Sequence, residues 1–254
     1  MKIRMLGTGY GPCKNKRKYS KEFRGRGGVL VDEHILIDAP DDIFEVAKEL
    51  GFDEIFNTVT DVLISHSHEG HFSPRAVLRL AQRKRVRVFA SEKVLSRLPE
   101  SPNIERHPIG VFSELVVGEY TAAALPTNHQ TSDPAEECFS FLLVGSRTLF
   151  YALDGGFFNK RAFNVLKMLK IDCAVLDCAL EGEPISERHL YHNDLNTLVK
   201  MKGILESAGI TGEKTKYIVS HIPTDKKREI HFELAPIVAQ HGMVLAYDGY
   251  FARI

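Results

Sequence analysis

The hydrophobic residues of this chain recur at two different spacings, which predict two kinds of secondary structure. In DDIFEVAKELG (41–51), apolar residues recur at helical spacing and a glycine ends the run, so we predict a helix there. The segments KIRMLG (2–7) and GVLVDEHILIDA (28–39) contain apolar runs that are typical of strands. The polar stretch 32–34 interrupts the second segment, which predicts a hairpin turn between two strands.

The rest of the chain follows an α/β pattern. Its middle is rich in predicted strands, whereas the segments on both sides alternate strands with helices. The further predicted strands are 61–65, 86–90, 113–125, 138–145, 148–154, 171–178, 216–221 and 243–249. The further predicted helices are 74–84, 91–98, 159–170, 194–209 and 227–242. No linker rich in Gly, Ser or Pro and no short repeat interrupts the pattern. We therefore predict one domain over residues 1–254, with two mixed β-sheets and outer helices rather than a doubly wound parallel sheet.

The composition limits the classes of protein to which this chain can belong. Hydrophobic residues make up 44% of its 254 residues, which is enough for a large core. Lys plus Arg and Asp plus Glu both number 33, so the chain lacks the positive charge of most nucleic-acid-binding proteins. No apolar run approaches the roughly 20 residues that span a bilayer, and the N-terminus lacks the apolar segment of a signal peptide. We expect a cytoplasmic protein without membrane contact.

The basic N-terminal region and the cysteines carry weaker signals. The stretch KNKRKYSKEFRGRGG (14–28) is interpreted as a solvated loop because of its charges and glycines. The cysteines, Cys13, Cys138, Cys173 and Cys178, show no CxxC spacing. We expect buried thiols rather than disulfides, and no structural zinc at Cys13.

Three histidines lie close together in ISHSHEGHFS (64–73), directly after a predicted strand. Residues two apart in an extended segment point to the same side, so His66 and His68 can converge on one point. His71 follows on the same loop. Because neutral imidazole is the commonest protein ligand for metals of the zinc class, this pattern predicts a metal site.

Further candidate ligands stand at the ends of other predicted strands. His129 follows an apolar run in ALPTNHQT, and His221 ends the strand KYIVSH. Asp154 ends a strand before two glycines, a position that is by itself typical of a turn residue. The repetition of a donor residue after an apolar strand is, however, how α/β enzymes build their sites.

These motifs resemble the metallo-β-lactamase superfamily of metal-dependent hydrolases. The later motifs resemble, in particular, the phosphodiesterases of bacterial phosphonate degradation (the carbon-phosphorus lyase pathway), which open cyclic ribose phosphates. The resemblance extends over nearly the whole chain and implies an α/β fold of four layers, an αββα sandwich. The matching motifs in chain order are LGTGYG, LIDA, HSHEGH, LPTNH, YALDGG, VLDC, HNDLNT, VSHI and YDG.

The resemblance also implies ligands for two divalent metal ions, with zinc or manganese expected. The first ion would be held by His66, His68, His129 and Asp154. The second ion would be held by His71, His221 and the shared Asp154. Two ions suit phosphodiester hydrolysis, because they acidify a bridging water into a hydroxide nucleophile and offset the charge that builds on the phosphoryl oxygens.

Other residues are candidates to assist from outside the ligand set. His192 matches a family histidine that contacts the scissile phosphate or protonates the leaving alkoxide, which suits an imidazole. Asp38 could brace a ligand imidazole, or it could simply end a strand in a turn. Asp194 stands near His192, where it could also cap a helix.

The sequence departs from the superfamily motif at Gly70, where the motif has an aspartate before the third histidine. Glycine supplies no donor atom, so the second site loses a carboxylate. Three arrangements remain open. The second ion binds weakly through His71, Asp154 and His221 with added water; Glu69 reaches in through an altered loop; or a single ion suffices. Of these we expect the first.

The leading hypothesis is a metal-dependent phosphodiesterase that hydrolyses a small or cyclic anionic phosphodiester. The alternatives are a nuclease or a thioester or lactone hydrolase of the same superfamily, or a metal-binding protein that has lost its activity through Gly70. The motif HNDLNT (192–197) favours phosphate over thioesters and lactones, and the neutral net charge argues against long nucleic acid. A homodimer is compatible with the sequence.

Overall fold

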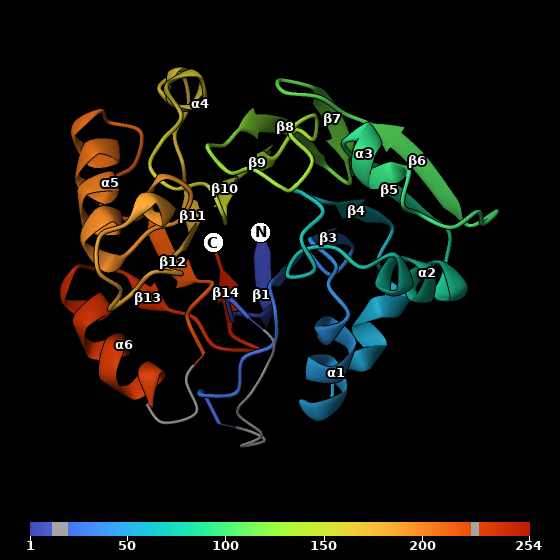
Figure 1. Cartoon of the computed structure of the whole chain (residues 1–254), viewed down its shortest axis with the longest axis horizontal. Helices are drawn as coiled ribbons and strands as arrows, with labels where there is room; N and C mark the ends of the chain where they lie inside the picture. Colours follow the sequence, from blue (N-terminus) through green and yellow to red (C-terminus); the bar gives the residue numbers. More distant parts are fainter. Residues whose placement is uncertain (12–19, 225–228) are drawn as a thin grey trace.

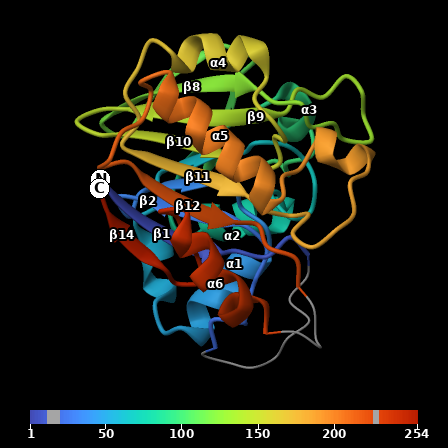
Figure 2. The same ribbon diagram turned by 90° about the vertical axis from the view of Figure 1, so that its left-hand side faces the viewer.

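Two β-sheets pack face to face and carry helices on their outer faces, as Figure 1 and Figure 2 show for the computed structural model. The structure describes residues 1–11, 20–224 and 229–254. Helices α1 and α2 lie on one side of the sandwich, and α5 and α6 lie on the other. The predicted fold class, an αββα sandwich of two mixed sheets, is confirmed.

The first sheet has seven strands in the spatial order β14-β1-β2-β3-β4-β5-β6. Its strands are β1 (Lys2–Gly7), β2 (Gly28–Val31), β3 (Ile35–Ile37), β4 (Asp61–Leu63), β5 (Val86–Ala90), β6 (Ile104–Pro108) and β14 (Phe251–Arg253). Strands β1, β2, β3 and β14 pair antiparallel, whereas β3 to β6 pair parallel. The loop that carries the first three candidate histidines follows β4, which is one of the parallel strands.

The second sheet also has seven strands, in the order β13-β12-β11-β10-β9-β8-β7. Its strands are β7 (Glu114–Val117), β8 (Tyr120–Pro126), β9 (Phe139–Val144), β10 (Thr148–Ala152), β11 (Cys173–Asp177), β12 (Lys216–Ser220) and β13 (Val244–Leu245). Strands β7 to β10 pair antiparallel and β10 to β13 pair parallel. Each sheet is therefore mixed.

Short helices connect and cover the strands. They are α1 (Asp42–Glu49), η1 (Asp53–Asn57), α2 (Pro74–Arg83), α3 (Glu92–Leu95), α4 (Lys160–Leu166), η2 (Glu187–Leu190), α5 (Leu195–Ser207) and α6 (Ile230–Gln240). Among the described residues, none of these helices is long and apolar enough to cross a membrane.

The alternation of side chains along the strands divides the core into three layers. Val29 and Val31 of β2 belong to the cluster between the two sheets, whereas Leu30 belongs to the cluster between the first sheet and its helices. A third cluster fills the space between the second sheet and α4, α5 and α6. Residues two apart on a strand share a face, so one apolar run such as GVLV serves two layers at once.

Several element boundaries differ from the predictions. The predicted strand 113–125 is two strands, because Gly118 adopts a left-handed conformation (φ 54°) that turns the chain between β7 and β8. The edge strands β6 and β14 were not predicted. They are short, and their polar residues hide the strand pattern.

The interpretation of 14–28 as a solvated loop is wrong for the part that the structure describes. Residues 14–19 and Cys13 lie outside the described residues. Phe23, Arg24 and Gly25, by contrast, are buried. Local composition predicts solvent exposure for such a stretch, but partners from distant parts of the chain make burial possible.

The buried guanidinium of Arg24 is the centre of a polar network that ties this loop to both ends of the chain. Its Nη1 donates to Thr8 Oγ1 (2.7 Å) and to the Ala246 carbonyl (2.9 Å), and its Nη2 lies 3.1 Å from His231 Nδ1. The Thr8 hydroxyl donates in turn to Asp248 Oδ1 (2.7 Å). Removing Arg24 would take a buried donor from the Thr8 hydroxyl and from the Ala246 carbonyl, and a nearby positive charge from the buried Asp248 carboxylate, which is costly.

We expect Arg24→Met to lower the free energy of unfolding by about 3–5 kcal/mol, measured by urea denaturation. Arg147→Met is the control. Arg147 pairs with Asp172 at 2.9 Å, but its side chain is 53% exposed, so its loss should cost less than about 1 kcal/mol. Equal and small effects of the two substitutions would contradict the role of the network.

Candidate metal centre

The candidate ligands meet at one end of the sandwich, because each follows the end of a strand. His66, His68 and His71 lie on the loop after β4, and His129 follows β8. Asp154 follows β10, and His221 follows β12. The cavity at this end has a volume of about 310 Å³. It is lined by Tyr10, Gly11, Arg26, His68, Glu69, Gly70, His71, His129, Asp154, His192 and His221.

Four candidate ligands converge on one point, namely His66, His68, His129 and Asp154. His68 Nδ1 lies 3.1 Å from His66 Nε2 and 3.0 Å from His129 Nε2. Asp154 Oδ2 lies 3.5 Å from His66 Nε2 and 3.8 Å from His129 Nε2. Ligands about 2.0–2.1 Å from a tetrahedral zinc ion lie about 3.3–3.4 Å from one another. The spacing of the four donor atoms therefore fits a single tetrahedral ion.

The environment keeps these imidazoles neutral, as metal ligation requires. Burial lowers the pKa of His66 well below its ordinary value, and burial likewise lowers the pKa of His68. Burial lowers the pKa of His129 to about 3, although Asp154 opposes the shift. His66 Nδ1 lies 3.0 Å from Ser65 Oγ, whose proton points to Asp38 Oδ2 at 3.0 Å. His66 must then donate from Nδ1, which leaves the lone pair of Nε2 for the cluster.

A second group of donors shares Asp154. His71 Nε2 lies 2.9 Å from Asp154 Oδ2, and His221 Nε2 lies 3.0 Å from Asp154 Oδ1. Burial disfavours the charged form of His71, but the flanking carboxylates of Asp154 and Asp38 outweigh it and raise the pKa to about 10. A positive charge is therefore stabilised between the two carboxylates. A proton on His71 can supply it, and so can a divalent ion at Nε2.

Asp38 holds His71 from the side opposite the cavity. Its Oδ2 accepts from the Tyr151 hydroxyl (2.7 Å) and lies 2.7 Å from His71 Nδ1. A carboxylate oxygen in this position requires the Nδ1–H of His71 as a donor, so Nε2 is free to bind a metal. Of the two roles considered for Asp38, a brace and a strand-end turn, both are compatible with its contact to His71 and its left-handed turn after β3.

His192 contacts the same carboxylate from a third direction. Its Nδ1 lies 3.0 Å from Asp154 Oδ1 and 3.9 Å from Asp177 Oδ2. Burial opposes protonation of His192, but Asp154 and Asp177 outweigh it and raise its pKa. Asp177 is fully buried and accepts from the backbone and side chain of Asn193. Sequence reasoning did not select Asp177, although it ends a buried strand in the quoted motif VLDC.

Unpartnered atoms support the interpretation as a metal centre. His71 Nε2, His192 Nδ1 and His221 Nε2 lie 2.9–3.0 Å from Asp154 oxygens, but these contacts lack hydrogen-bond geometry. Among the described residues, these three buried nitrogens and Asp154 Oδ1 therefore have no hydrogen-bond partner. Such atoms are costly to bury unless a cation completes them. Three groups of donors could hold an ion, and all three include Asp154. The other members are His66, His68 and His129 in the first group, His71 and His221 in the second, and Asp177 and His192 in the third. Histidine with carboxylate oxygen is a donor set that suits zinc and manganese alike.

The backbone is strained at two candidate ligands and at the carboxylate that contacts His71 from behind. Asp38, Asp154 and His221 have positive φ values of 61°, 52° and 58°. This left-handed region is uncommon for residues other than glycine, and such strain is concentrated at functional sites. Asp38 and His221 come directly after β3 and β12, and Asp154 comes two residues after the end of β10.

Glu69, Gly70 and Asp194 contribute no donor to the four-residue group around His68. Glu69 has a side chain that is 85% exposed, and its carboxylate pairs with Arg26 (3.2 Å). A Cβ at Gly70 would meet no atom of the described chain within 4 Å, so the place of the missing side chain is open. Asp194 caps α5 by accepting from Thr197 N (2.7 Å), which was the alternative for this residue.

Glu136, which sequence reasoning also missed, fixes the loop between two of the ligands. Its buried carboxylate accepts from Ser67 N (2.7 Å) and from Ser67 Oγ (2.6 Å). Ser67 stands between His66 and His68, so this carboxylate ties the first histidine loop to the loop that carries His129. No sequence spacing indicates the contact, because 69 residues separate its partners.

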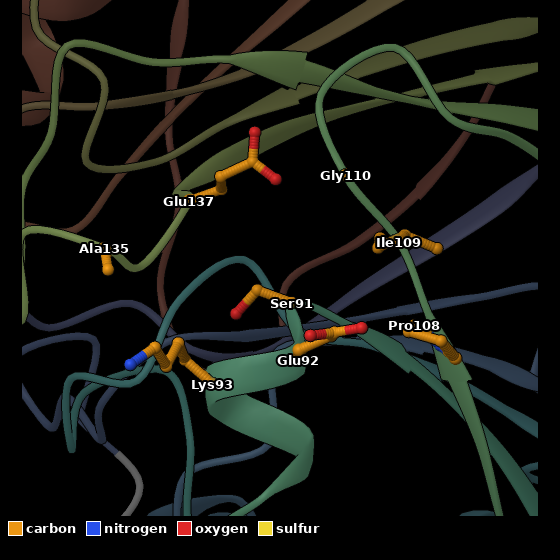
Figure 3. Close-up of a pocket in the computed structure, with 8 residues that line it drawn as sticks. All are labelled: Ser91, Glu92, Lys93, Pro108, Ile109, Gly110, Ala135 and Glu137. Atoms are coloured by element: carbon orange, nitrogen blue, oxygen red, sulfur yellow. The ribbon is translucent and has the colours of Figure 1, made fainter.

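A second cavity lies between β5–α3, the end of β6 and the loop before β9 (Figure 3). Ser91, Glu92 and Lys93 line it on one side and Glu137 on the other. Among the described residues that line it, none belongs to the histidine cavity. It therefore does not extend the candidate metal centre, although Glu137 is the direct neighbour of Glu136.

A family model described as "Beta-lactamase superfamily domain" matches residues 33–222. The chain is also similar to several solved structures. One is the metallo-β-lactamase fold protein YhfI from Bacillus subtilis, with a TM-score of 0.72 and 15% identity over 99% of this chain and 98% of that one. A diphosphatase of the PhnP family has a TM-score of 0.70 and 20% identity over 100% and 97%. The short form of human tRNase Z has a TM-score of 0.67 and 12% identity, over 100% of this chain and 99% of that one. No curated protein sequence matches this chain.

We expect Glu136→Gln to weaken metal binding at the group His66, His68, His129 and Asp154 by about 10–100-fold, because supporting carboxylates contribute this much to metal affinity. Competition with a chromophoric zinc chelator measures the effect. Glu137→Gln is the matched control, since it removes the same charge from the neighbouring residue, which faces the other cavity. Equal losses in the two variants would show that Glu136 has no particular role in holding the loop.

Proposed function

The chain belongs to the β-lactamase superfamily, and from that premise we propose that it is a metal-dependent phosphodiesterase acting on small or cyclic phosphodiesters. The observation that carries the proposal is the position of His192. Its Nδ1 lies 3.0 Å from Asp154, the carboxylate that the two histidine donor groups share, and it lines the same cavity. A proton donor beside a two-metal site suits an ester with a poor leaving group.

His192 acts on the leaving group in this proposal. Asp154 and Asp177 face its Nδ1 and raise its pKa against the effect of burial, so the imidazole can hold a proton on Nε2. Water attacks phosphorus, releases a proton to solvent and forms the new P–O bond, while the P–O bond to the leaving alkoxide breaks. The Nε2 proton passes to that alkoxide, which leaves as a neutral alcohol.

The donor groups described above would hold two ions, zinc or manganese. When bound, such ions acidify the attacking water and offset the negative charge on the phosphoryl oxygens. Asp154 supplies a donor to each group and fixes their separation. The group of His71, His221 and Asp154 has one donor fewer than the first group. With Glu69 turned to Arg26, we propose that the second ion binds more weakly and completes its shell with water or substrate.

The alternatives differ in the ester that is cleaved. A diphosphatase and a tRNase among the similar structures support phosphorus chemistry, although both are less than 25% identical to this chain. The neutral net charge argues against long nucleic acid as the substrate. We also propose a cytoplasmic location, which the free buried thiols of Cys138, Cys173 and Cys178 support.

We expect protein loaded with Zn²⁺ or Mn²⁺ to hydrolyse both bis(4-nitrophenyl) phosphate and a 2′,3′-cyclic nucleotide. His192→Ala should lower kcat by about 10²–10⁴-fold for the cyclic nucleotide, whose alkoxide needs a proton to leave, and by much less for the nitrophenyl ester, whose leaving group is stable without one. Elemental analysis of the variant should find unchanged metal content, which separates proton transfer from ligation. His107→Ala is the control, because His107 pairs with Glu105 outside the cavity.

Other outcomes of the same assay assign the chain differently. Hydrolysis of thioesters or lactones without phosphodiester hydrolysis would replace the proposed substrate class. Bound metal without hydrolysis of any ester would indicate a metal-binding protein that has lost its activity.

We expect Gly70→Asp to retain the second ion at chelator concentrations that strip it from the unmodified protein. The open space at this position accommodates a side chain, and a carboxylate adds the missing donor. Gly70→Asn is the control for size without charge. Metal stoichiometry after dialysis against graded chelator measures the effect. If Asp and Asn variants release the ion equally, the asymmetry does not originate at this position.

A further inference from the structure

We propose that Arg26 binds a second anionic group of the substrate, and that the carboxylate of Glu69 occupies this place in the free protein as an internal competitor. The inference rests on the proposed function, because it concerns the same cavity. It adds a specificity residue at the rim and names the class of substrate that the rim selects. That class is a phosphodiester that carries a further phosphate or carboxylate away from the reacting ester.

The guanidinium of Arg26 is held in one orientation by Asp42 of α1. Arg26 Nε and Nη2 donate to Asp42 Oδ1 at 3.1 and 2.8 Å, and the Arg26 backbone N donates to Oδ2 at 3.0 Å. Both side chains are mostly buried, at 16% and 17% exposure. A planar guanidinium that is fixed along one edge presents its remaining nitrogen, Nη1, in a fixed direction.

The partner of Nη1 is easily displaced. Arg26 Nη1 lies 3.2 Å from Glu69 Oε1, and the Glu69 side chain is 85% exposed. An ion pair with so exposed a member contributes only about 0–1 kcal/mol. Arg26 therefore has one permanent partner in Asp42 and one exchangeable partner in Glu69. The exchangeable carboxylate shows which chemistry this position accepts, namely an anionic oxygen.

The position is continuous with the metal centre. Arg26, Glu69 and Gly70 line the cavity together with His71 and His221. Apart from the two neighbouring residues, a Cβ at residue 70 would meet no described atom within 4 Å, so the part of the cavity beside Gly70 is open. The next residue along from Arg26 approaches the ligands closely, since a Cβ at Gly27 would lie 3.8 Å from His221 Nδ1.

A substrate that reaches from the metal centre to Arg26 must compete with Glu69 for Nη1. Its second anionic group gains a charge-assisted hydrogen bond there, whereas a substrate with one anionic group leaves the Arg26–Glu69 pair intact. Arg26 therefore affects the affinity only of ligands that carry a second anionic group, and so distinguishes these from ligands with one. Removing the Glu69 carboxylate should strengthen the binding of ligands that carry a second anionic group and leave the binding of ligands with one such group unchanged.

The test uses ligands that cannot be hydrolysed: propylphosphonate with one anionic group, and 3-phosphonopropionate and propane-1,3-bisphosphonate with two. Isothermal titration calorimetry of the metal-loaded protein gives Kd. We expect Glu69→Gln to lower Kd for the two ligands with a second group by up to about fivefold, and to leave propylphosphonate unchanged. The ligand that gains more identifies the preferred second group, carboxylate or phosphonate.

Glu119→Gln is the matched control, because it removes one exposed negative charge away from the cavity. We expect no change in that variant. Arg26→Lys should raise Kd only for the ligands with two groups, since lysine keeps the charge but loses the fixed fork. Thermal denaturation checks that Arg26→Lys folds. If Arg26→Lys does not fold, the Glu69→Gln measurement decides the proposal by itself.

Equal tightening of all three ligands in Glu69→Gln, or no tightening of any, would overturn the proposal. Because no ligand is cleaved, these outcomes leave the phosphodiesterase assignment untouched. Conversely, a protein that cleaves no phosphodiester but shows the expected pattern of binding would keep this rim site and lose the proposed activity.

Discussion

The site depends on one buried carboxylate. Asp154 is 4% exposed, and burial alone would raise its pKa, yet the surrounding imidazoles, chiefly those of His221 and His71, hold the pKa well below its usual value. A charge in this position needs positive charge around it, from protons or from divalent ions. Histidines from the ends of several strands surround Asp154. The need to balance the charge of this one carboxylate therefore explains why so many imidazoles meet at this end of the sandwich.

The fold meets that requirement through strand ends and strained turns. Strands β4, β8, β10 and β12 end at the same edge of the molecule and deliver the ligands there. The left-handed conformations of Asp154 and His221 then turn these side chains toward one another. Carboxylates outside the cluster complete the arrangement, because Asp38 orients His71 and Glu136 fixes the backbone at Ser67.

The two sides of the centre differ in ways that bear on function. The group that contains His68 and His129 is complete with four donors, whereas the group that contains His71 has three and faces the open space at Gly70. The Glu69 carboxylate does not join this group and pairs instead with Arg26 at the rim. The more open side of the centre is thus also the side on which the cavity has a fixed cation, which suits the approach of an anionic substrate.

The sequence by itself determined the fold class and the residues available for chemistry. Periodicity is local, so it predicts helices such as α2 and strands such as β2, and a donor after an apolar strand indicates an edge where ligands can meet. Only the tertiary structure decided what depends on long-range contacts: that Glu136 holds Ser67, that Asp177 faces His192, and that Arg24 is buried. The direction of a side chain on a loop follows from partners far along the chain, and no local pattern records which partners those are.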